Sequence, residues 1–175
     1  MYVPDRYRVG YTVNHWRNIM VKKIRQIYVD GCAVGGALNR RFSSETKPFW
    51  DAVIDGKIRI IVSDVLLGEI ERAPQSVHDF FGSLAESHIE RVVSTDESNA
   101  LAERYIAEGV VGETSLDDCK HIALATIHRA DVLVSWNFKH IVNLDRIEGY
   151  NSVNMKLGYP QINIRTPYEV IHDEN

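Results

Sequence analysis

Acidic side chains stand at the ends of segments whose composition is typical of β-strands. Asp30 directly follows the apolar run 27–29, and Glu69 lies shortly after the β-branched run 58–62. Asp118 lies in the first turn of a later segment with helical periodicity. In open α/β sheets, ligands bind beyond the carboxyl ends of the strands, so acids at those points are candidates for chemistry.

Several carboxylates gathered without basic partners repel one another and raise one another's pKa, which structure alone rarely requires. A divalent cation removes this conflict, and oxygen-only ligands favour the hard ions Mg²⁺ or Mn²⁺. Such ions activate water and neutralise a phosphate under in-line attack. We therefore predict phosphodiester hydrolysis by metal-activated water, with Asp30, Glu69 and Asp118 as catalytic metal ligands.

The segment around Asp118 carries further groups that favour a site. Asp117 and Asp118 fall where a helix dipole favours carboxylates, and Ser115 is positioned to cap that helix. His121 follows Asp118 by three residues and shares its helix face. We expect His121 to orient an acid or make a structural hydrogen bond, because the two further histidines of a typical zinc site are missing nearby. Asp117 is the reserve metal ligand.

Each acid also has a purely structural interpretation. Asp30 before Gly31 is compatible with a turn, and Glu69 borders an apolar helix stripe, where an exposed ion pair is common. Asp118 at a helix N-terminus stabilises the dipole, typically by less than about 1 kcal/mol. Asp131 precedes a strand and is expected at the opposite edge of the sheet, outside the site.

Strand and helix patterns alternate along the chain. Strand patterns cover residues 27–29, 58–62, 89–93, 132–134 and 162–164. Helix patterns cover residues 33–38, 49–54, 64–72, 77–86, 99–108, 116–129 and 141–150, and Ser63 is positioned to cap the third. This order predicts an α/β fold with a mostly parallel central sheet of about five strands flanked by helices on both faces. We interpret residues 1–25 as an N-terminal extension and 26–175 as one domain.

Composition narrows the class of protein. The 175 residues carry a net charge of −4, which argues against a protein that coats nucleic acid nonspecifically, although residues 1–27 are basic. No apolar stretch is long enough for a membrane span, and the N-terminus lacks the pattern of a secretion signal, so we expect a cytoplasmic protein. Cys32 and Cys119 have no zinc-binding spacing and are expected to be small buried residues.

Four segments, taken in order, resemble successive motifs of the PIN-domain family. They are Ile27 to Asp30, Ser63 to Glu69, Asp118 to Ala125 and Leu133 to Asn137. The more specific parts are the Asp-x-x-His-x-Ala-x-Ala helix and the segment Val-Ser-Trp-Asn-Phe-Lys-His. The match covers roughly residues 26–166.

The resemblance implies a PIN-like fold and an activity like that of VapC-type toxins. It implies an endoribonuclease that depends on Mg²⁺ or Mn²⁺, acts on RNA and is the toxin of a type II toxin–antitoxin pair. A small cognate antitoxin protein would hold it inactive, and the protein would be a homodimer without a membrane association.

One position departs from the commoner family pattern. Many PIN domains have an aspartate after the fourth strand where this chain has Asn137, with Ser135 in the usual Ser/Thr place. We expect Asn137 to line the site, as a carbonyl ligand or by holding a metal-bound water, and to contribute less to affinity than an acid. Lys120, Lys139 and His140 are candidates for phosphate contacts, although solvated lysines are the commoner case.

These residues have three alternative interpretations. A haloacid-dehalogenase-like phosphatase needs a second aspartate two residues after Asp30, where this chain has Cys32. Gly31, Gly35 and Gly36 miss both the Rossmann and the P-loop spacing of a nucleotide-binding module. A catalytically weak or inactive PIN-fold protein that acts as a binding partner stays open as the main alternative.

Overall fold

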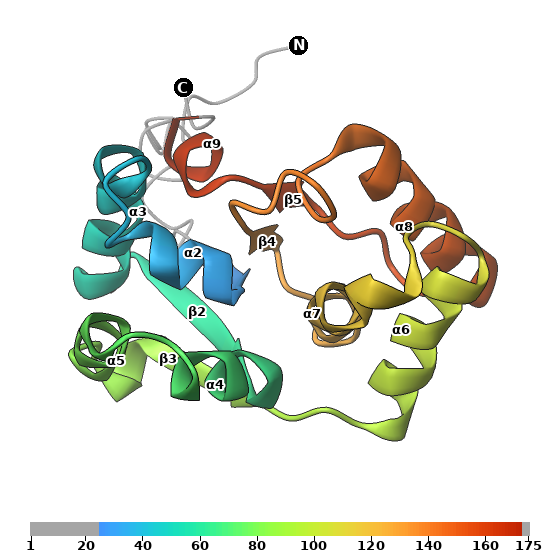
Figure 1. Ribbon diagram of the computed structural model, residues 1–175, viewed down its shortest axis with the longest axis horizontal. Helices are drawn as coiled ribbons and strands as arrows, with labels where there is room; N and C mark the ends of the chain where they lie inside the picture. Colours follow the sequence, from blue (N-terminus) through green and yellow to red (C-terminus); the bar gives the residue numbers. More distant parts are fainter. Residues whose placement is uncertain (1–24, 173–175) are drawn as a thin grey trace, which may run out of the picture.

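Five strands form one parallel sheet in the computed structural model, which describes residues 25–172 (Figure 1). They are β1 (Arg25–Val29), β2 (Ile58–Ser63), β3 (Ile89–Val92), β4 (Val132–Val134) and β5 (Ile164–Arg165). Their order across the sheet is β3-β2-β1-β4-β5, and all four neighbouring pairs are parallel. The predicted fold class is confirmed.

Eight α-helices and two short 3₁₀-helices connect these strands within residues 25–172. The α-helices are α2 (Gly31–Gly36), α3 (Ser43–Ile54), α4 (Asp64–Glu71), α5 (Gln75–Gly82), α6 (Asp96–Ala107), α7 (Leu116–Ile127), α8 (Leu144–Leu157) and α9 (Pro167–His172). The 3₁₀-helices η1 (Glu86–His88) and η2 (Glu113–Ser115) precede β3 and α7. None of these helices is long and apolar enough to cross a membrane.

The sheet separates two apolar cores. Helices α6, α7 and α8 pack on one face, and α2, α3, α4, α5 and α9 cover the other, as Figure 1 shows with the sheet between them. Residues 27–29 of central strand β1 are buried on both faces of the sheet and form an unbroken apolar run. Because strand side chains alternate, Ile27 and Val29 enter one core while Tyr28 enters the other.

The strand order places the end of β1 beside the end of β4. The chain first builds β1, β2 and β3 on one side, then crosses back to add β4 and β5 on the other. Val29 is in register with Val134, so Asp30 and Ser135 follow at the same edge of the sheet. Such a point, where the strand order reverses, is where open α/β sheets bind ligands.

Several boundaries differ from the sequence prediction. The last strand is Ile164–Arg165 and not 162–164, because Asn151 takes both backbone groups of Ile162 out of the ladder. Helix α8 begins at Leu144, after Asn143 accepts a hydrogen bond from the Arg146 N–H. Helix boundaries elsewhere shift by a few residues, as fraying and capping make usual.

Helix α9 was not predicted, although its start carries a signal. Thr166 and Glu169 bond reciprocally across the first turn, and Pro167 occupies the first helical position. This is a capping box with proline at its favoured place.

Three smaller predictions are corrected. Ser115 precedes α7 but does not cap it, because its hydroxyl lies 3.3 Å from Nδ1 of His140. Cys119 is buried as expected, whereas Cys32 is exposed because it lies on the outward side of short helix α2. Arg25 already belongs to β1. The interpretation of residues 1–24 as an extension falls outside the described residues.

Candidate active site

Asp30 is a buried carboxyl group at the junction of β1, β4 and α2. Its Oδ1 accepts the Ala33 N–H at 2.8 Å and so caps α2, and its Oδ2 accepts the Ser135 hydroxyl at 2.6 Å. Only 2% of the residue is exposed. Loss of water raises the pKa of Asp30 to about 6, although His121 and both hydrogen bonds act to lower that pKa.

Glu69 reaches from α4 to the start of α2. Its Oε2 accepts the Gly31 N–H at 3.0 Å, and its Oε1 lies 3.2 Å from Nε2 of His121. A Cβ at Gly31 would collide with the Glu69 carboxylate, so glycine is required for this approach. The negative charge of Glu69 contributes to the raised pKa of both Asp30 and Asp118, which means that the three acids interact.

Asp118 and Asn137 join helix α7 to the segment after β4. The Asn137 Nδ2 donates to Oδ1 of Asp118 at 3.0 Å, while its Oδ1 accepts the His140 N–H at 3.1 Å. These two partners fix the orientation of the amide, because only its NH₂ side can donate to a carboxylate. Partial burial raises the pKa of Asp118, against the lowering effect of His140 and His121. The Asn137 N–H also donates to Ser135 Oγ.

A buried chain of hydrogen bonds lies behind Glu69. The Leu66 N–H donates to Ser63 Oγ at 3.2 Å, which confirms Ser63 as the cap of α4. Ser63 Oγ also lies 2.6 Å from the Tyr28 hydroxyl oxygen. That oxygen lies 2.8 Å from Nδ1 of His121. Because the Glu69 carboxylate that faces Nε2 of His121 can only accept, it favours the ring proton on Nε2; Nδ1 of the neutral ring then accepts from the Tyr28 hydroxyl, and Tyr28 accepts from Ser63. We infer that the neutral His121 ring carries its proton on Nε2, facing Glu69.

The pKa of His121 reflects a balance of opposed effects. Burial lowers it, but the contact with Glu69 and the charges of Asp30 and Asp118 outweigh burial, so the pKa is raised. Its Nε2 is buried and is not aligned for a hydrogen bond, although Glu69 Oε1 is near. His121 thus interacts with several acids at once from a fixed position.

The other sequence candidates lie around this group or away from it. Asp117 is exposed and pairs with Lys120 at 3.0 Å, so both are engaged with each other outside the group. Lys139 is exposed on the segment after β4. Asp131 accepts the Gln26 N–H near the start of β1, which places it at the opposite edge of the sheet, as predicted.

Sequence reasoning missed Tyr28 and the contact that Ser63 makes with it. Tyr28 was taken only as an apolar strand residue, yet alternation along β1 turns it into a core where its hydroxyl needs a partner. That requirement was the available signal. The partner itself, His121, is 93 residues away in the chain.

The acids fit a hard divalent cation in the kind of donor they offer. Asp30, Glu69 and Asp118 supply oxygen atoms, and their charges oppose one another. Within residues 25–172, however, no three His, Cys, Asp or Glu side chains are already grouped to hold an ion. Binding therefore requires side-chain rotation, and the metal site stays a prediction.

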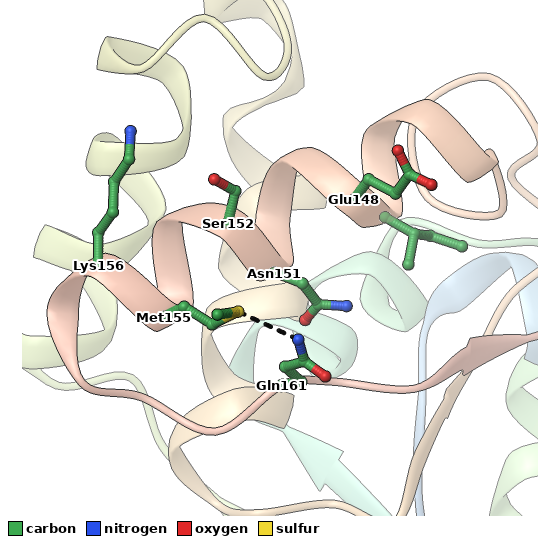
Figure 2. A pocket seen from close by; sticks show the side chains of 7 residues that line it. Glu148, Asn151, Ser152, Met155, Lys156 and Gln161 are labelled. Carbon is green, nitrogen blue, oxygen red and sulfur yellow. Dashed lines mark hydrogen bonds between the residues drawn. The ribbon is translucent and has the colours of Figure 1, made fainter.

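Two cavities lie on different parts of the molecule. One of about 210 Å³ opens beside Glu69 and is lined by Gly31, Cys32 and residues of α4 and α5. Another of about 560 Å³ runs along α8, where Figure 2 shows Glu148, Asn151, Ser152 and Lys156 around it. The second shares no residue with the acidic group, so its greater size does not make it the candidate site.

No family model matches the sequence, and no curated protein matches it either. Solved structures do match. The VapBC2 complex from Rickettsia felis, solved with a DNA fragment from its promoter, aligns over 81% of this chain and 98% of that chain, at 15% identity and a TM-score of 0.50. VapC20 from Mycobacterium tuberculosis, a toxin that cleaves the sarcin–ricin loop, aligns over 65% and 91%, at 16% identity and a TM-score of 0.50.

The chain has a PIN-like, VapC-type fold. At these identities the likeness establishes the fold alone, and the chemistry has to be argued from the residues. In this PIN-like chain Asp30, Glu69 and Asp118 come from three separate elements, and Glu69 interacts electrostatically with the other two.

Asp30→Asn is expected to stabilise the metal-free protein at neutral pH. The folded-state pKa of Asp30 is about 6, above its ordinary value of 3.8. The protonated carboxyl group therefore contributes its full share of folding stability below about pH 4, and this share is lost as the pH rises through 6. Asparagine can still cap α2 and bond Ser135. The gain at pH 7, from urea unfolding with EDTA, should be about 2–3 kcal/mol.

The same comparison at pH 4 should show little difference between the two proteins. Asp117→Asn, which changes an exposed acid, is the matched control and should change stability little at either pH. Equal stability of Asp30→Asn and wild type at pH 7 would contradict the electrostatic cost assigned to Asp30.

Tyr28→Phe is expected to remove the contact that holds the neutral His121 ring in one tautomer. The change removes the hydroxyl that donates to Nδ1 and leaves two buried polar groups unsatisfied, at a cost of about 1–3 kcal/mol. The ¹⁵N chemical shifts of the His121 ring should report an Nε2–H tautomer in wild type and a changed one in the variant. Tyr105→Phe, which loses a buried bond to Asn154 elsewhere, should cost similar stability but leave those shifts unchanged.

Proposed function

We propose that this chain is a metal-dependent endoribonuclease that hydrolyses RNA phosphodiester bonds. The observation that carries the proposal is that Asp30, Glu69 and Asp118 lie toward the carboxyl ends of the central strands, where burial first, and the charge of Glu69 in addition, raise the pKa of Asp30 and Asp118. Structure alone rarely needs such a cluster. The VapC-type fold supports it, since VapC20, which shares that fold, is described as a toxin that cleaves the sarcin–ricin loop.

The three acids would hold Mg²⁺ or Mn²⁺, with Asn137 beside them. A bound ion of this kind supplies Lewis-acid stabilisation of the phosphate and lowers the pKa of water. The chain's own residues would do the positioning: Ser135 orients Asp30, Asn137 orients Asp118, and His121 with the Gly31 N–H orients Glu69. Burial of Asp30 excludes competing water from its carboxylate.

The biological setting is proposed from the same likeness. VapBC2 is described as a complex bound to DNA from its promoter. We therefore propose that this chain is the toxin of a type II toxin–antitoxin pair, with a cognate antitoxin protein and a homodimeric state. RNA is the proposed substrate.

The alternative is a PIN-fold protein that binds partners without catalysis. Two observations favour it: the Asn137 amide turns its NH₂ toward Asp118, and the carboxylates within residues 25–172 are not closed around an ion. A metal-dependence assay separates the two functions.

Wild-type protein should cleave a mixed RNA pool only with Mn²⁺ or Mg²⁺, and Asp30→Asn should not cleave it. The substitution removes the most buried acid of the proposed metal site. The measurement is single-turnover cleavage at graded metal concentrations, with Asp117→Asn as a control that keeps activity. Metal at a hundredfold excess over its Kd should also stabilise wild type by about 2.7 kcal/mol, and the gain should vanish in Asp30→Asn.

Equal cleavage by wild type and Asp30→Asn would assign the signal to a contaminating nuclease. Absence of metal-dependent cleavage and of metal-dependent stabilisation together would leave the binding-only function.

Asn137→Asp should tighten metal binding while weakening the metal-free fold. It replaces the bond between Nδ2 and Asp118 with a repulsion between carboxylates, while the His140 N–H keeps its acceptor. With metal present, the added charge becomes an added ligand. Melting temperatures titrated with Mn²⁺ should therefore start lower and rise further than those of wild type, and an unchanged metal Kd would contradict a ligand position at residue 137.

A further inference from the structure

Three aromatic rings form a patch beside the candidate active site. Phe42 stacks on Trp136 with ring centroids 4.7 Å apart and planes inclined by 17°. The ring centroids of Phe138 and Trp136 lie 5.9 Å apart, and 51% of Phe138 is exposed. We call Phe42, Trp136 and Phe138 the aromatic platform.

The platform is anchored from below. The Trp136 Nε1 donates to Thr46 Oγ1 at 2.9 Å, and the indole packs so closely on α2 that a Cβ at Gly36 would lie 2.5 Å from its Cδ1. Trp136 is buried, so it supports the other two rings and does not itself meet solvent. Phe138 is thereby presented outward from a fixed base, although an exposed phenylalanine gains nothing for the fold.

Basic side chains lie on the two segments that carry these rings, in a chain that is acidic overall. The Arg41 guanidinium lies 5.3 Å from the centre of the Phe42 ring, and Arg40 and Lys139 are exposed on the same two segments. Segments 37–42 and 136–143 contain no aspartate or glutamate, whereas the whole chain has a net charge of −4. Exposed rings interleaved with arginine and lysine are the pattern that binds single-stranded nucleic acid.

The platform lies within reach of the acids. Asn137, which donates to Asp118, is the residue between Trp136 and Phe138. Helix α2 runs from its cap, Asp30, to Gly36 under Trp136, and six residues of helix measure roughly 9 Å. A nucleotide held at the platform would therefore be a close neighbour of a phosphate held at the acids.

We propose that the aromatic platform stacks an unpaired base of the RNA substrate, with Arg41 and Lys139 contacting the adjoining phosphates. This inference rests on the proposed nuclease function and specifies its substrate as RNA that is single-stranded next to the cleaved bond. Bases inside a duplex have both faces covered by their neighbours, whereas a looped-out base offers a free face for stacking. The surrounding positive charge favours RNA over an apolar protein segment as the occupant.

Binding is tested with the full chain in EDTA, so that no cleavage intervenes. The probes are a fluorescein-labelled single-stranded RNA dodecamer and the same RNA annealed to its complement, followed by fluorescence anisotropy. Wild type should bind the single strand more tightly than the duplex. Phe138→Ala should raise the Kd for the single strand about tenfold, since one base stack on an aromatic ring is of that order.

Matched variants separate stacking from simple apolar contact. Phe138→Trp should bind like wild type, whereas Phe138→Leu, apolar but not planar, should bind as weakly as Phe138→Ala. Met155→Ala removes an exposed apolar side chain from the cavity along α8 (Figure 2) and should leave the Kd unchanged. Arg41→Ala and Lys139→Ala should each reduce the dependence of the Kd on salt.

The outcomes are decisive in either direction. An unchanged Kd in Phe138→Ala, or no single-strand binding by wild type, overturns the platform. Wild-type RNA binding by Phe138→Leu also overturns it, because a side chain that cannot stack would then serve equally well. RNA cleavage measured in parallel with Mn²⁺ tests the proposed function separately. Cleavage with no binding effect of Phe138→Ala would support the nuclease and rule out the platform. A binding effect of Phe138→Ala with no cleavage by wild type would support the platform and rule out the nuclease.

Discussion

The carboxyl group of Asp30 is buried where the central strand β1 meets β4, and the neighbouring structure is organised around that burial. The Ser135 hydroxyl, the first turn of α2 and the imidazole of His121 each favour its charged form. They do not fully offset the loss of solvent, so the pKa remains raised. The domain therefore carries an electrostatic cost at its centre, and such costs are characteristic of sites that bind a ligand.

The groups that bond the three acids are neutral donors and imidazole, not lysine or arginine. Asp30 is held by a hydroxyl, Asp118 by an amide, and Glu69 by a backbone N–H beside His121. Such donors fix direction without cancelling charge. The arrangement keeps the acids oriented and leaves their negative potential available to a cation, while the basic side chains lie farther out around the aromatic platform.

The sequence predicted the architecture well, because periodicity and strand composition report directly on burial. It also placed the acids that follow β1 and β2 toward one edge of the sheet, since the carboxyl ends of parallel strands share an edge, while their joint role as metal ligands stays a prediction. It did not predict the partners that orient those acids. The contact of Tyr28 with His121 and the orientation of Asn137 depend on side-chain placement across elements that are distant in the chain. Ile162 lies outside β5 for the same reason, because its backbone N–H donates to the Asn151 side chain, a contact that no local sequence pattern reveals.

The strand order also sets the sequence of events during synthesis on the ribosome. Asp30 is made early, but Ser135, which bonds it, follows 105 residues later, and β4 is the strand that closes over that edge. Until then the nascent chain can build only three of the five strands, and the carboxyl group of Asp30 has neither its hydroxyl partner nor strand β4 beside it. A shortened translation product that ends before β4 would therefore contain all three acids but lack Ser135 and Asn137, which bond Asp30 and Asp118.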